Sequence, residues 1–131
     1  MKVTGLSWVG TRTSEFDPMV SFLTNVFELT PSVEEDGFAV FELPNGDKIE
    51  VFGADDEHHR FFTTGPVVGF RVAHVPAAQE EMEAAGIEFL GRPASASDGY
   101  AWSHFRAPDG NVYEIMSGPE STSKKRGGSP E

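Results

Sequence analysis

Two glutamates, Glu50 and Glu114, are the first residues whose type and spacing suggest chemistry. Each ends a ten-residue segment of the pattern Phe-x-x-Pro-Asn/Asp-Gly-x-x-x-Glu, which begins at Phe41 in one copy and at Phe105 in the other. A carboxylate in an apolar cavity is costly unless it is paired, and an unpaired one acquires a raised pKa. Such a group can act as a general base or hold a cationic ligand. The structural alternative is a salt bridge to one of the strand arginines, Arg12, Arg71 or Arg106.

His104 lies one residue before the second segment and is the third candidate for catalysis. Its imidazole can shuttle a proton or orient a ligand near neutral pH. A structural histidine with its hydrogen bonds satisfied inside the fold remains the alternative. Glu50, Glu114 and His104 are therefore the predicted catalytic residues if the protein is an enzyme.

Strand alternation places these polar groups on one face of the predicted sheet. Helices must cover the face that carries Ile49, Val51 and Ile115, so Glu50 and Glu114 point to the concave side. The same alternation predicts that a small molecule contacts apolar and aromatic neighbours there, as in most ligand pockets. Packing of these side chains against one another is the competing interpretation. The predicted ligand-binding residues are Trp8, Phe38, Phe52, Val67, Trp102, His104 and Met116.

An internal repeat predicts how the chain builds this surface. Besides the two ten-residue segments, Val9-Gly10-Thr11-Arg12 matches Val68-Gly69-Phe70-Arg71 near the start of each half. Two matches in the same order indicate a duplicated unit. We expect one compact domain with a first module over residues 1–53, a linker over 54–64, a second module over 65–117 and a flexible tail over 118–131.

Each half predicts a strand, a helix and three further strands. Residues 3–12 and 66–72 fit strands, and Asp17-Pro18 fits the N-cap and first position of a helix. Residues 76–85 form the second predicted helix, with Gly86 at its C-terminal cap. Asn45-Gly46 and Asp109-Gly110 fit tight turns between the last two strands of each half.

Composition excludes several classes of function. The formal net charge of −11 opposes nucleic-acid binding and favours cationic small molecules. With no cysteine there is no disulfide and no thiolate metal site. The sequence has neither an apolar run long enough for a membrane span nor a signal-peptide core, so we expect a cytoplasmic protein.

The paired strand–helix–three-strand unit, with its Phe-x-x-Pro-Asp-Gly-Asn-x-x-Glu strand, resembles the vicinal oxygen chelate superfamily over residues 3–117. That superfamily includes glyoxalases, extradiol dioxygenases and fosfomycin- and bleomycin-resistance proteins. The resemblance implies an α+β fold in which tandem βαβββ modules form a curled mixed sheet around a concave pocket, with the helices outside. It also implies a homodimer, either swapped or unswapped.

In metal-dependent members of the superfamily, four strand positions supply the ligands. Carried over to this sequence, two of these positions fall on Glu50 and Glu114, and the other two fall on Trp8 and Val67. Trp and Val cannot coordinate a metal, so we expect no cofactor. A divalent metal on Glu50 and Glu114 remains open if His104, or His58 and His59 of the linker, completes the site.

Three functions follow from these residues. The first is a metal-independent binding protein of the bleomycin-resistance kind, holding an aromatic or cationic molecule with a glutamate as counter-charge. The second is a metal-dependent enzyme of the glyoxalase or dioxygenase type, a lyase or an oxidoreductase. The third is a metal-free lyase or isomerase with Glu50 or Glu114 as general base.

Overall fold

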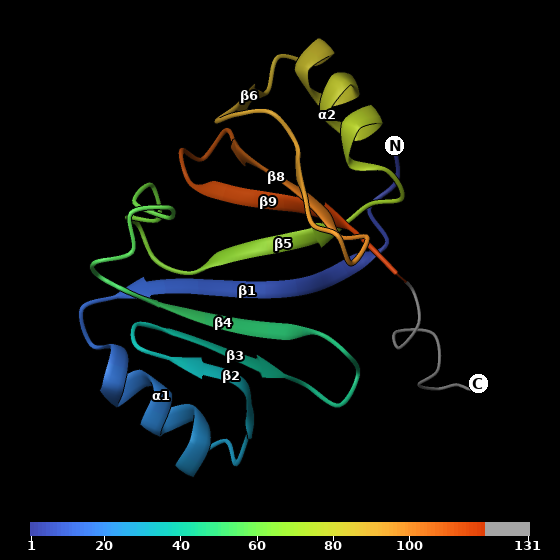
Figure 1. Ribbon diagram of the computed structural model, residues 1–131. Helices are drawn as coiled ribbons and strands as arrows, with labels where there is room; N and C mark the ends of the chain where they lie inside the picture. The colour runs from blue at the N-terminus through green and yellow to red at the C-terminus, as the bar shows by residue number, and fades with distance from the viewer. Residues whose placement is uncertain (120–131) are drawn as a thin grey trace. The chain divides into compact units, whose positions relative to one another are not determined.

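The computed structural model describes residues 1–119, which form two compact units. The first unit is Trp8–Val67, and the second unit combines Met1–Ser7 with the chain from Val68 onward. The predicted tail lies outside the described residues from position 120. Each unit has one helix packed on strands of a mixed sheet (Figure 1). The predicted α+β class with a duplicated strand–helix–strand module is therefore confirmed.

The first unit places its strands in the order β2-β3-β4-β1. β1 and β4 are parallel, with Trp8 opposite Lys48 and Gly10 opposite Glu50, whereas β3 is antiparallel to both of its neighbours. The last strand of the module thus returns to lie beside the first. Its elements are β1 (Gly5–Thr13, whose first three residues belong to the second unit), α1 (Phe16–Asn25), β2 (Pro31–Glu35), β3 (Phe38–Glu42) and β4 (Lys48–Gly53).

The second unit repeats this pattern with the order β5-β9-β8-β6. β5 and β9 are parallel, and β8 is antiparallel to β9. One predicted strand is divided into two short pieces, β6 and β7, which both pair with β8. The elements are β5 (Val67–Arg71, whose first residue belongs to the first unit), α2 (Val75–Ala84), β6 (Glu88–Phe89), β7 (Ala94–Ser95), β8 (Ala101–Arg106) and β9 (Val112–Ser117).

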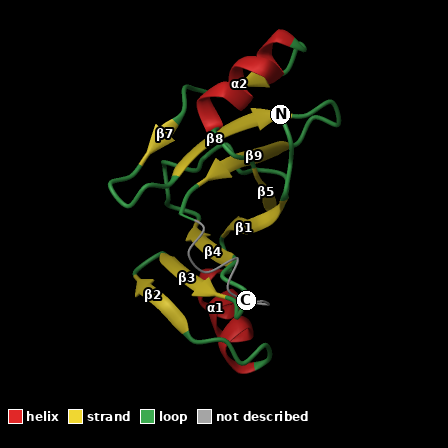
Figure 2. Ribbon diagram, turned by 90° about the vertical axis from the view of Figure 1, so that its right-hand side faces the viewer, coloured by secondary structure: helices red, strands yellow, loops and turns green. Residues whose placement is uncertain are grey.

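Each helix buries an apolar stripe on one face of its own sheet. Val20 and Leu23 of α1 pack with Ala39, Phe41 and Val51. In the second unit, α2 lies along β8 (Figure 2), and its core includes Val75, Ala78, Phe105 and Ile115. Alternate strand residues fill these cores, so their neighbours in sequence project from the opposite face.

The helix starts differ from prediction at one point. Asp17 is not the N-cap of α1, because the helix begins at Phe16 and Glu15 occupies the cap position. The Glu15 carbonyl accepts the first helical hydrogen bond from Met19, and its own N–H donates to the Thr13 hydroxyl. At α2 the cap is His74, whose Nδ1 accepts from the Ala77 N–H at 3.2 Å.

Both predicted tight turns between the last strands are present. Gly46 has φ 92° and Gly110 has φ 87°, values that favour glycine. Neither helix within residues 1–119 is long and apolar enough to cross a membrane.

Candidate functional site

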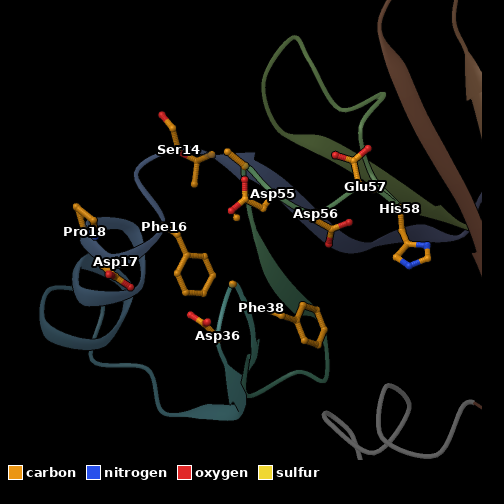
Figure 3. A pocket seen from close by; sticks show the side chains of 14 residues that line it. Ser14, Phe16, Asp17, Pro18, Asp36, Phe38, Asp55, Asp56, Glu57 and His58 are labelled. Carbon is orange, nitrogen blue, oxygen red and sulfur yellow. The ribbon is translucent and has the colours of Figure 1, made fainter.

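An open pocket of about 770 Å³ lies within the first unit, where several chain segments meet (Figure 3). The start of α1, the β2–β3 turn, the end of β4 and the residues after it form its walls. Its volume lies within the range typical of small-molecule sites. The lining residues are Thr13, Ser14, Phe16, Asp17, Pro18, Asp36, Gly37, Phe38, Gly53, Ala54, Asp55, Asp56, Glu57 and His58.

The lining combines negative charge with aromatic rings. Two phenylalanines, Phe16 and Phe38, stand among the carboxylates, and no Lys or Arg of residues 1–119 is part of this lining. Carboxylates and aromatic faces both attract organic cations. The lining carboxylates are Asp17, Asp36, Asp55, Asp56 and Glu57.

Two glycines let the strand ends approach closely at the pocket. Gly37 has φ 79° in the two-residue turn that joins β2 to β3, and its carbonyl accepts a hydrogen bond from the Gly53 N–H at 2.9 Å. A Cβ on Gly53 would lie 3.4 Å from the Cα of Gly37. The backbone conformation at Gly37 therefore favours glycine, and this turn holds Asp36 at the pocket wall.

The segment Ala54–Phe62, called the strap here, is fixed at its start by Arg12. Nη2 of Arg12 donates to the Ala54 carbonyl at 2.7 Å, and Nε donates to the Asp56 carbonyl at 3.1 Å. The Asp56 carboxylate in turn accepts from the backbone N–H of His59 and lies 3.1 Å from its Nδ1. Burial raises the pKa of Asp56, but the hydrogen bonds and charge of His59 outweigh it, so that pKa lies below its ordinary value.

The strap also packs on the sheet face opposite α1. The His59 ring stacks on Phe52 with centroids 3.9 Å apart, and Phe38 stacks on Phe52 at 5.6 Å. Phe62 contacts Phe52, His59 and Trp8 at centroid distances of 6.0, 5.1 and 6.2 Å. Phe52 is 2% exposed and Phe62 is 3% exposed. Side chains of the chain itself therefore cover part of the face predicted to contact a ligand.

Trp8 lies over Gly10 on the same strand face. A Cβ on Gly10 would collide with the six-membered ring of the indole. The first-strand motif Val-Gly-x-Arg thus has a packing role at its glycine, because only glycine leaves room for this tryptophan.

The second unit holds a buried acid–histidine pair. His104 on β8 is opposite Glu114 on β9 in the strand register, and Nε2 lies 3.1 Å from Oε2. Glu114 is 6% exposed. Burial raises its pKa, and the hydrogen bond and charge of His104 oppose this only in part, so the pKa of Glu114 lies above its ordinary value.

The remaining predicted residues are placed as follows. Trp102 and Met116 are opposite each other in the same register, and the Met116 sulfur accepts a hydrogen bond from the Ser7 hydroxyl at 2.7 Å. Glu50 lies on β4 opposite Gly10, and Val67 is 2% exposed at the start of β5. Of the predicted site residues, Phe38 and His58 line the described pocket.

The structural alternatives for the glutamates are partly resolved. Arg12 donates to strap carbonyls, and Arg106 donates to the Gly110 carbonyl at 3.0 Å. Glu114 is paired with His104, whereas the sequence suggested one of the strand arginines as its partner.

Most of the acidic pocket was missed from sequence. Its lining comes from separate segments, so no local motif marks it. Two signals were available: the Asp36-Gly37 pair, which is typical of a two-residue hairpin turn, and the acidic run at Asp55-Asp56-Glu57.

Comparison with known proteins agrees with the duplicated module. Residues 5–115 match the model of the Glyoxalase/Bleomycin resistance protein/Dioxygenase superfamily. The chain belongs to this superfamily. A comparison with curated proteins found no match.

Solved structures with this fold include enzymes of the superfamily. The Mn(II)-bound glyoxalase from Novosphingobium aromaticivorans is 24% identical to this chain, with a TM-score of 0.70. The match covers 88% of this chain and 39% of the glyoxalase chain. The methylmalonyl-CoA epimerase from Mycobacterium tuberculosis is 18% identical over 89% of both chains, with a TM-score of 0.67. A hypothetical protein from Bacillus halodurans C-125 is 18% identical over 88% of this chain and 95% of its own, with a TM-score of 0.69. At these identities the likeness establishes the fold alone.

The donor set does not fit the metal site of metal-dependent superfamily members. Trp8 and Val67 offer no donor atom for a metal, and Glu114 is paired with His104. Residues 1–119 contain no group of three or more His, Asp or Glu side chains placed to hold a metal ion.

Proposed function

We propose that this superfamily member binds a small organic cation in the acidic pocket of the first unit, and does so without a metal ion. The observation that carries the proposal is the lining itself, which combines five carboxylates with two phenylalanine rings; the side chain of Asp36 lies between Phe16 and Phe38 (Figure 3). A cation entering there gains charge attraction from several directions and a cation–π contact with Phe16 or Phe38.

The overall charge supports the same ligand class. A net charge of −11 raises the local concentration of cations and repels anions at long range. The lowered pKa of Asp56 keeps that wall of the pocket negatively charged well below neutral pH.

A calorimetric titration with choline tests this proposal. Choline should bind wild-type protein, and Asp36→Asn and Asp55→Asn should each weaken binding by about fivefold, because each removes one charge facing the cation. Glu80→Gln and Glu88→Gln alter exposed acids of the second unit and change net charge equally, so they serve as matched controls. If both pairs of variants weaken choline binding equally, the binding depends on the net charge of the protein and not on this pocket.

Metal independence has a separate test. Chelator treatment followed by choline titration should leave the affinity unchanged. A fall in affinity that added divalent metal restores would contradict the metal-free part of the proposal while leaving the pocket itself in place.

A second candidate function is acid–base catalysis at the His104–Glu114 pair. A buried carboxylate whose pKa is raised by burial is a stronger base than an exposed one, and the imidazole 3.1 Å away can exchange a proton with it. Proton-exchange measurements by NMR on carbon acids with a carbonyl-activated C–H would test it. Hydrogen exchange that wild-type protein catalyses and that Glu114→Gln loses would support this function. If wild-type protein gives no exchange above the rate in buffer, this function is contradicted.

A further inference from the structure

The His59 ring contacts both an aromatic face and a carboxylate. It lies face to face on Phe52, with a centroid separation of 3.9 Å and an interplanar angle of 23°. One ring nitrogen, Nδ1, lies 3.1 Å from the Asp56 carboxylate. A planar ring that carries an N–H group therefore rests on an aromatic face while that group meets a carboxylate.

A planar cationic ligand that bound on Phe52 would make the same two contacts, a ring stack on Phe52 and a hydrogen bond to the Asp56 carboxylate. We propose that the face of Phe52 covered by His59 is a ring-binding subsite, and that a planar aromatic cation occupies it by displacing His59. The inference rests on the proposed cation-binding function and specifies the ligand class that the pocket selects.

The covered ring of Phe52 adjoins the acidic pocket through Phe38. Phe38 lines that pocket and stacks on Phe52 at 5.6 Å with an interplanar angle of 22°. Asp55, Asp56 and Glu57 line the pocket and precede His59 in the strap, with one residue between Glu57 and His59. A ligand ring on Phe52 would thus bring its charged nitrogen to the carboxylates that form the pocket wall.

The strap is fixed at its ends and carries His59 between them. Arg12 binds the carbonyls of Ala54 and Asp56 at the start, and Phe62 is buried at the end with 3% exposure. The His59 side chain keeps 27% exposure, so its outward path to solvent is short. The backbone of His59 is held by the Asp56 carboxylate, which accepts from its N–H, and by the Phe62 N–H, which donates to its carbonyl, so the ring leaves Phe52 by turning the side chain outward and giving up its contact with Asp56.

Calorimetry with two cations tests the inference: protonated 2-aminobenzimidazole, which is planar, and choline, which has no ring. Removing the imidazole in His59→Ala should strengthen 2-aminobenzimidazole binding by about fivefold, since the ligand no longer competes with a ring stack. His59→Phe keeps the subsite filled with a ring and should weaken that binding by a similar factor. Thr63→Ala, which changes an exposed residue just beyond the strap, should have no effect.

A measurement on wild-type protein avoids any folding defect in the variants. Because the His59 ring stacks on Phe52, its ring protons should be shifted upfield in the free protein. Saturating 2-aminobenzimidazole should remove that shift, whereas choline should leave it. His59 signals that keep their shift at saturation, or equal affinities in His59→Ala and His59→Phe, would overturn the ring-binding subsite.

The two proposals fail in different ways. If choline binds but the affinity for 2-aminobenzimidazole does not depend on residue 59, the acidic pocket is retained and the subsite alone is overturned. If neither cation binds wild type or His59→Ala, both proposals are overturned.

Discussion

Nε2 of His104 lies 3.1 Å from Oε2 of Glu114, on neighbouring antiparallel strands whose register places the two residues opposite each other. The contact lies on the sheet face away from α2, whose own side is filled by Phe105 and Ile115. Burial raises the pKa of this carboxylate, and the imidazole of His104 offsets only part of that rise. The free energy of unfolding therefore depends on whether Glu114 is protonated.

Glu114→Gln should change how stability depends on pH. Because the folded-state pKa of Glu114 is raised, its contribution favours folding below the unfolded-state pKa and is lost as pH rises through the folded-state pKa. The variant cannot ionise there, so its thermal midpoint relative to wild type should rise as the pH increases from about 4, the ordinary pKa of glutamate, toward neutral. Calorimetric unfolding across that range measures it. A difference that is constant, or that falls with pH, would contradict the raised pKa.

Gly10→Ala should destabilise the first unit. The added Cβ meets the Trp8 indole, which must move out of its packed position, at a cost of about 1–3 kcal/mol. Urea unfolding gives the loss, and tryptophan fluorescence in a Trp102→Phe background reports the displaced ring. Gly5→Ala is the matched control because a Cβ there has no neighbour within 4 Å. Equal effects at both glycines would mean that strand propensity, not the Trp8 contact, is responsible.

Gln79→Ala should weaken the second unit by about 2–3 kcal/mol, because it leaves buried polar groups without their partner. Gln79 accepts a hydrogen bond from the Ser103 hydroxyl at 2.6 Å and donates to the Gly91 carbonyl at 3.0 Å. Adding Ser103→Ala should recover part of the loss, which a double-mutant cycle by urea unfolding measures. Fully additive losses would show that the two side chains are not coupled.

Arg12→Ala should loosen the strap. Two hydrogen bonds to strap carbonyls are lost, so local opening should become about tenfold more frequent, and trypsin should cut after Arg60 faster by a similar factor. Arg106→Ala provides the control, since Arg106 also donates to a backbone carbonyl but does so in the second unit. Unchanged cleavage at Arg60, or equal acceleration by both variants, would show that Arg12 does not hold the strap.

The duplicated modules and their sheet faces could be predicted because they depend on local pattern. Asp109-Gly110 joins β8 to β9 through a short turn, so alternation alone places His104 and Glu114 on one face. Ile49 and Val51 fall on the helix side for the same reason. These features need no knowledge of distant contacts.

The acidic pocket and the start of α1 could not be predicted in the same way. Asp17, Asp36 and Asp55 are separated along the chain and meet only when the first unit is folded. The Asp17-Pro18 pair fits a helix start, yet the Thr13 hydroxyl and the Glu15 carbonyl begin the helix earlier, which leaves Asp17 in its first turn. A carboxylate there is favourable beside the positive end of the helix dipole.

The division of β1 has a consequence for the order in which the chain acquires its structure. All residues of the first unit, Trp8–Val67, are contiguous, whereas the second unit combines Met1–Ser7 with the chain from Val68. During synthesis all residues of the first unit are present once residue 67 has emerged, while the opening residues wait for partners made later. Thr4, whose N–H donates to the Arg71 carbonyl, waits only a few residues more, but Ser7, whose hydroxyl donates to Met116, waits for the last strand of the second unit. Such long-range closure is slow, so the second unit should set the overall folding rate.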